Sequence, residues 1–151
     1  MNENQDCLAY AGLLQVEHQA LHQRLRSLQA EFNNVAAPRV GAALQRSMLE
    51  TGTQLRADLA HHFAQEENGG CLDYAASRVP AVAGIARELE HEHPLLLAHL
   101  DEMLQELRLA PPDTLYVATI KEKFDALVVK LLAHEERENR IVQRGFNMEL
   151  D

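Results

Sequence analysis

The sequence lacks the features of several common protein classes. Cysteine is scarce, and Cys7 and Cys71 stand far apart without forming a Cys-x-x-Cys pair, so neither a redox dithiol nor a thiolate zinc site is expected. No apolar run approaches the roughly 20 residues that a membrane helix needs. The first residues include neither a basic stretch nor the apolar core of a signal peptide. We therefore expect a soluble cytoplasmic protein in which Cys7 packs as a small apolar residue.

Positive charge is also in deficit. The 151 residues include 14 lysines and arginines against 23 aspartates and glutamates, which is a formal net charge of -9. Because no basic patch is evident, nucleic acids and anionic membranes are not expected as partners. The length fits one domain, residues 1–151, which is large enough to bury a single apolar core.

Apolar residues recur at alternating spacings of four and three, which is the period of a helix with one buried face. We call each such row of residues a seam. Four seams are present without a strand pattern, so we predict an all-α, up-down-up-down four-helix bundle. The stretch from Cys71 to Arg78 shows no clear period and is predicted to be a connection. The predicted helices span approximately residues 7–33, 38–68, 80–107 and 114–144.

Pro94 lies inside the third predicted helix. A proline there removes one backbone hydrogen bond and clashes with the preceding turn, at a cost of roughly 3 kcal/mol unless the helix kinks. Because Pro94 directly follows His93, a kink could aim that histidine.

Polar residues interrupt the fourth seam, which runs from Ile120 to Ile141. His134 and Glu138 stand one turn apart at positions where apolar residues are expected. Burying them without partners would cost roughly 1–3 kcal/mol for each group, and more for a charged carboxylate. A metal ion would offset this cost.

This His-x-x-x-Glu pair has a counterpart in the second predicted helix, 72 residues earlier. A single histidine in the first helix likewise matches one in the third, 75 residues later. The order along the chain is therefore His, His-x-x-x-Glu, His, His-x-x-x-Glu. The six residues are His18, His62, Glu66, His93, His134 and Glu138.

In an antiparallel bundle these six side chains can all point inward at a similar depth. Four imidazoles and two carboxylates exceed the ligand number of tetrahedral zinc, whereas they suit two iron ions bridged by the two glutamates. Each iron would have two histidines and two carboxylate oxygens, with room for an oxo or hydroxo bridge and one exchangeable position. Small-molecule chemistry is expected at that position.

At these residues the sequence resembles the hemerythrin-like (HHE cation-binding) family, along nearly the whole chain. The resemblance implies a four-helix bundle with a non-haem di-iron centre that binds or reacts with dioxygen, nitric oxide or peroxide. Oxygen-carrying hemerythrins have a further histidine on the third helix, where this chain has Leu97, and an aspartate on the fourth helix, where it has Asn139. The pattern is more similar to the di-iron domain of bacterial iron-sulfur-cluster repair proteins, which implies a role in stress response or cluster repair.

The remaining histidines are interpreted by their position. His61, His91 and His99 fall off the seams and are expected to face solvent. His22 lies one turn past His18, so a fifth imidazole ligand and a surface position both stay open. Four glutamates adjoin ligand positions and are expected to face solvent, with a role in orienting an imidazole N–H as the alternative. They are Glu17, Glu67, Glu92 and Glu135.

These observations leave three functional hypotheses. The first is a di-iron protein that binds or turns over a small oxidant. The second is a non-catalytic module for oxygen or redox sensing, or for iron storage. The third is a structural bundle without metal, in which replacing His62 or Glu138 by alanine would be harmless. A homodimer through one face of the bundle is compatible with the sequence, without a specific signal.

Overall fold

A computed structural model describes residues 3–34, 41–69, 71–110 and 114–146. Within these ranges the chain forms α-helices and one 3-10 turn, and no strand. The all-α prediction is therefore confirmed. The elements are α1 (Glu3–Asn33), α2 (Ala42–Gly69), α3 (Cys71–Arg78), η1 (Pro80–Val82), α4 (Ala83–Leu109) and α5 (Thr114–Phe146).

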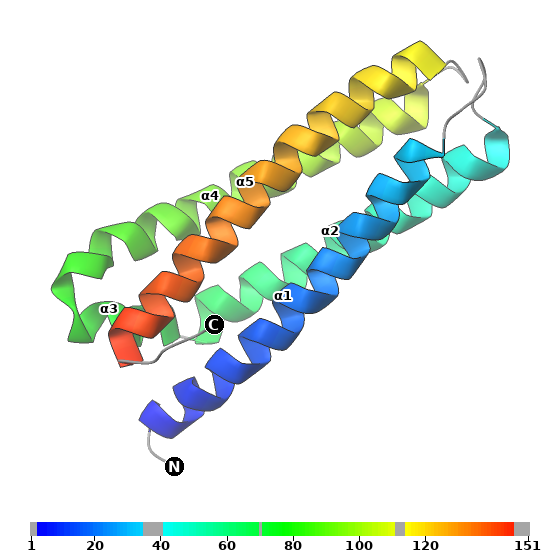
Figure 1. The fold of residues 1–151 in the computed structure, drawn as a ribbon. Helices are drawn as coiled ribbons and strands as arrows, with labels where there is room; N and C mark the ends of the chain where they lie inside the picture. The colour runs from blue at the N-terminus through cyan, green and yellow to red at the C-terminus, as the bar shows by residue number, and fades with distance from the viewer. Residues whose placement is uncertain (1–2, 35–40, 70, 111–113, 147–151) are drawn as a thin grey trace.

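The four long helices run alternately up and down, as Figure 1 shows. Helix α1 packs against α2 and α5, and α4 completes the ring because it packs against the same two helices. The short α3 lies at the end of the bundle where α1 begins and α5 finishes (Figure 1). The predicted up-down-up-down bundle is thus present, with one additional short helix.

Apolar side chains from all four long helices form the main core. Leu28 of α1 and Leu100 of α4 are completely buried. Phe32 stacks on Phe124 across the bundle, with the ring centroids 5.4 Å apart. Each fully buried side chain of this size contributes about 1.5–3 kcal/mol. The seams therefore pack as their spacing predicted.

The residues from Cys71 to Arg78 connect α2 to α4 as predicted, but they form a short helix that the sequence did not indicate. Eight residues make little more than two turns, which is too few to show a repeating period in the sequence. Leu72 and Ala75, one turn apart, are buried in a second apolar cluster with Ile141 and Val142 of α5. This cluster closes the end of the bundle, so polar residues between it and the main core have apolar neighbours on both sides.

Helix α4 continues through Pro94. The proline ring is exposed, whereas the preceding His93 is buried. Solvent on this outer side of the helix can hydrogen-bond the backbone carbonyl that the proline leaves free, which reduces the cost of the lost bond.

Some predictions concern residues outside the part of the chain that the structure describes. The predicted start of the second helix at Pro38 and the packing of the Cys7 side chain lie outside it. Among the described helices, none combines the length and the apolar character that crossing a bilayer requires.

The main core predicts a specific cost for Leu100→Ala. Removing this buried side chain leaves a cavity that its helical neighbours cannot fill, so the free energy of unfolding should fall by about 3 kcal/mol. Leu95 lies on the same helix but is 69 % exposed, and Leu95→Ala should change stability by less than about 0.5 kcal/mol. Urea unfolding of both metal-free variants measures the difference, and equal losses would contradict the assigned core.

Candidate metal centre

All four long helices contribute to a buried polar centre. One histidine comes from α1 and one from α4, whereas α2 and α5 each supply a histidine and a glutamate separated by one turn. None of the six residues is more than 5 % exposed. The structure therefore brings together His18, His62, Glu66, His93, His134 and Glu138.

The first group of these residues could hold one cation. The Nε2 atoms of His18 and His62 lie 3.2 Å apart. Glu66 Oε1 is 2.5 Å from His62 Nε2, and Glu138 Oε2 is 3.5 Å from His18 Nε2. These four residues each offer a ligand atom within 4.8 Å of the others.

The second group could hold another cation. Here Glu66 Oε2 is 3.0 Å from His93 Nε2, and Glu138 Oε1 lies against His134 Nε2. Both glutamates belong to both groups, because each turns one carboxylate oxygen to either side. The two potential cation positions are therefore adjacent and share two carboxylates.

The hydrogen bonding of this centre fits a bound cation. Both oxygens of Glu66, both oxygens of Glu138 and the Nε2 atoms of His93 and His134 are buried and make no hydrogen bond of good geometry, although Glu66 oxygens lie 2.5 Å and 3.0 Å from imidazole nitrogens. Each such group would cost roughly 1–3 kcal/mol if it stayed unpaired. Imidazole nitrogens about 2.0–2.1 Å from one cation lie roughly 3.0–3.4 Å apart, and the observed 3.2 Å between His18 and His62 falls in this range.

The electrostatics of the centre also favour positive charge. Burial alone would lower the pKa of His62, but the carboxylates of Glu138 and Glu66 outweigh burial and raise it to about 11. The pKa values of His93 and His134 are raised for the same reason. Burial raises the pKa of Glu66. Burial would do the same at Glu138, but the surrounding histidines reverse the effect and hold its pKa well below the usual value.

Three glutamates outside the centre hold its imidazoles. Each accepts a hydrogen bond at the Nδ1 atom of a histidine on the next helix, which leaves Nε2 directed into the centre. The donors and acceptors are His62 and Glu17 (2.6 Å), His93 and Glu67 (3.0 Å), and His134 and Glu92 (2.9 Å). Glu67 is exposed as expected, whereas Glu17 and Glu92 are half-buried, and for all three the alternative of orienting an imidazole is confirmed as a contact. The partners could not be paired from the sequence, because they lie on different helices.

The other histidines have separate positions. His22 Nε2 donates to Glu135 Oε2 at 2.5 Å, and Glu135 is buried, which contradicts its expected solvent position. His22 belongs to neither group of potential ligands, so the fifth-ligand alternative is not supported. His61 and His91 are exposed as expected, whereas His99 is half-buried.

Phe63 also packs against the centre, which the sequence did not indicate. Its ring stacks on His93 with centroids 4.0 Å apart and an interplanar angle of 6°, and it meets the edge of His134 at 5.5 Å. Phe63 is 3 % exposed and is also part of the main core. It follows His62 directly and lies off the predicted seam, so its position in the sequence gave no signal.

Comparison with known proteins is consistent with this geometry. The family model of the hemerythrin HHE cation binding domain matches residues 11–146, a span that includes all six potential ligands. No curated protein and no solved structure matches the chain significantly. The match identifies the family over this range but does not assign individual ligands, so the six metal ligands stay a prediction.

The outer carboxylates predict how tightly a cation is held. Glu92→Gln should weaken the affinity for a divalent cation about 10- to 100-fold, because His134 would lose its anionic partner. Glu88 is a matched control, since it pairs with the same Arg137 as Glu92 but contacts no histidine of the centre. Competition against a chelator measures both affinities. If Glu88→Gln binds the cation as weakly as Glu92→Gln does, the loss of affinity comes from the disturbed Arg137 and not from the imidazole of His134.

The raised pKa of His62 predicts proton release when a cation binds. With a pKa of about 11, His62 carries a proton at neutral pH in the metal-free protein, and a cation must displace it. The apparent affinity should therefore rise with pH through the neutral range and fall in acid. Adding zinc to weakly buffered protein and titrating the released acid is the measurement, and no release would contradict the protonated centre.

Proposed function

The chain belongs to the hemerythrin HHE cation-binding domain family, and from that premise we propose that it is a non-haem di-iron protein. It binds or reacts with a small oxidant: dioxygen, nitric oxide or peroxide. We also propose a role in stress response or in the repair of iron-sulfur clusters, on the basis of the resemblance to the di-iron domain of repair proteins. Reversible binding without turnover, as in a sensor or an iron store, is the alternative that experiment must separate.

One observation carries the proposal: Glu66 and Glu138 belong to both groups of potential ligands. A single tetrahedral ion would need four ligands and would leave the remaining two buried and unpaired. Two ions that share both carboxylates use every residue of the centre. Mixed imidazole and carboxylate ligands in the core of a helical bundle suit iron, and bundles commonly build such sites from facing helices.

The residues of the chain determine how such a centre would work. A pair of iron ions would supply reversible one-electron chemistry at each position. The four histidines and two glutamates would hold the pair, and the outer carboxylates would keep three imidazoles in the correct tautomer. The two apolar clusters exclude bulk water from either end, which favours small ligands over large ones.

Metal analysis tests the proposal most directly. Protein purified without added metal should contain about two irons per chain, with near-ultraviolet absorption that disappears on reduction. Glu138→Ala should lose most of this iron, because both positions lose an oxygen ligand. His91→Ala is the matched control, since His91 is an exposed histidine on α4 and should leave the iron content unchanged.

Two results would contradict the proposal. Protein with one zinc and no iron would exclude a di-iron centre. A Glu138→Ala variant that is more stable than wild type and retains its metal would favour the structural bundle. Stopped-flow mixing of the reduced protein with each oxidant then separates turnover from slow, reversible binding.

A further inference from the structure

The two potential cation positions of the centre differ in the histidines that define them. The α1/α2 position has His18 and His62, and the α4/α5 position has His93 and His134. The same two glutamates serve both positions, so the glutamates do not distinguish one position from the other. Any preference of a cation for one position must therefore come from what surrounds the histidines.

Both histidines of the α4/α5 position have an outer carboxylate. Glu67 accepts the Nδ1 hydrogen bond of His93 at 3.0 Å, and Glu92 accepts that of His134 at 2.9 Å. Arg137 in turn holds Glu92 at 2.9 Å. An anionic partner at Nδ1 fixes the tautomer that leaves Nε2 for the cation, and it makes the imidazole a stronger ligand. Both rings of this position are therefore prepared to bind a cation.

Phe63 fixes the orientation of the same two rings. It stacks on His93 with centroids 4.0 Å apart and meets the edge of His134 at 5.5 Å. Because Phe63 is buried in the main core, it cannot move aside without leaving a cavity. The two imidazoles are thus held in place before a cation arrives, so binding costs less conformational freedom at this position.

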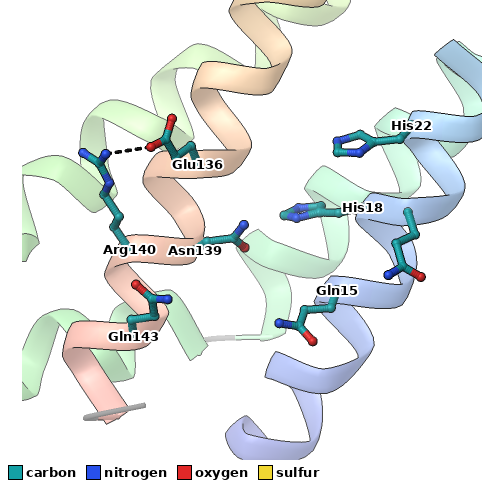
Figure 2. A pocket seen from close by; sticks show the side chains of 8 residues that line it. Gln15, His18, His22, Glu136, Asn139, Arg140 and Gln143 are labelled. Carbon is teal, nitrogen blue, oxygen red and sulfur yellow. Dashed lines mark hydrogen bonds and ion pairs between the residues drawn. The ribbon is translucent and has the colours of Figure 1, made fainter. Parts of the chain in front are cut away.

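The α1/α2 position has an outer carboxylate at only one of its histidines. Glu17 accepts the Nδ1 hydrogen bond of His62 at 2.6 Å. Within the part of the chain that the structure describes, no carboxylate contacts Nδ1 of His18, which borders a pocket of about 430 Å³ between α1 and α5. Figure 2 shows that Glu136, the one carboxylate in the lining of this pocket, turns away from His18 and pairs with Arg140. His18 is therefore the least supported of the four imidazoles.

The spacing of the α1/α2 imidazoles is the argument for the opposite preference. The Nε2 atoms of His18 and His62 lie 3.2 Å apart, as two ligands of one cation would. The same contact is a hydrogen bond in the metal-free protein, and a cation at this position must break it. The Nε2 atoms of His93 and His134 make no hydrogen bond of good geometry that a cation would remove. The spacing alone therefore does not favour the α1/α2 position.

Repulsion between the two cations makes the difference between the positions matter. Two like charges that share both carboxylates lie close together in a buried site, where their repulsion is only weakly screened. The second cation must therefore bind more weakly than the first, and binding takes place in two steps. The position whose imidazoles are better held is occupied in the first step.

We propose that the centre binds its two cations in a fixed order, first at the α4/α5 position and then at the α1/α2 position. This inference rests on the proposed two-cation function and names the residues that decide the order. Glu67, Glu92 and Phe63 are positioning residues for the first step, and Glu17 is the positioning residue for the second. When metal is limiting, the chain holds one cation and lacks the pair on which the proposed chemistry depends.

Nuclear magnetic resonance of the histidine rings tests the order without any reaction. Zinc is added in small steps to the metal-free protein, because it changes the resonance of a ring nitrogen that it binds and has no redox chemistry of its own. Below one equivalent, the Nε2 signals of His93 and His134 should take on the shift of a zinc-bound nitrogen. Those of His18 and His62 should follow only with the second equivalent. Simultaneous changes at all four rings, or a first change at His18 and His62, would overturn the proposal.

Two matched variants tie the order to the outer carboxylates. Competition against a chelator gives the two stepwise zinc affinities, and the histidine signals assign each step to a position. Glu92→Gln should lower the affinity of the α4/α5 position relative to the α1/α2 position about tenfold or more, and Glu17→Gln should raise this ratio by a similar factor. Both glutamates accept from an imidazole Nδ1, so each variant is the control for the other. A ratio that neither variant changes would show a merely structural role and overturn the assignment.

A second pair of variants tests the contribution of Phe63. Phe63→Leu keeps an apolar side chain in the core but removes the ring that holds two imidazoles, so the same ratio should fall about 2- to 10-fold. Phe32→Leu removes a ring that also stacks in the main core, roughly 21 Å along α1 from His18 at 1.5 Å per residue. It should lower the stability of the metal-free protein and leave the ratio unchanged. An equal fall in both variants would contradict the role of Phe63.

The outcomes separate the order of binding from the proposed function. Two zinc ions that bind together or in the opposite order would overturn the order and leave the di-iron proposal intact. Ordered binding of two zinc ions by a chain that contains no iron when purified would support the order and contradict the di-iron proposal. A chain that binds a single zinc ion would overturn both, because the second position would then not exist.

Discussion

Burial of four imidazoles and two carboxylates in one bundle is the constraint on which the rest of the structure depends. Charged and polar groups of this kind are costly in an apolar core unless they have partners. The six side chains come from four different helices, so they meet only when all four helices have the correct register. The main core on one side and the α3 cluster on the other maintain that register.

The charge balance of the centre explains why it suits cations. Two buried carboxylates raise the pKa values of three histidines, so the metal-free centre retains protons where positive charge is needed. A cation would replace those protons and pair the oxygens that lack hydrogen bonds. The outer glutamates add negative charge at Nδ1, which strengthens the imidazoles as ligands.

The centre is asymmetric despite its repeated motif. Three histidines have a carboxylate from a neighbouring helix, whereas His18 borders a polar pocket. The two halves of the sequence are related by the same His and His-x-x-x-Glu order, but their surroundings differ because each half meets different neighbours. A symmetric sequence pattern can therefore produce two potential cation positions whose surroundings differ.

The sequence by itself determined the seams, the bundle and the six inward positions, because helical periodicity is local and places residues three or four apart on one face. The same spacing indicated that His62 and Glu66 form a pair. The tertiary structure alone decided that Glu17, Glu67 and Glu92 hold histidines of other helices, that Phe63 stacks on His93, and that α3 closes the bundle. These contacts depend on the rotation and register of one helix against another. No spacing within a single helix encodes them.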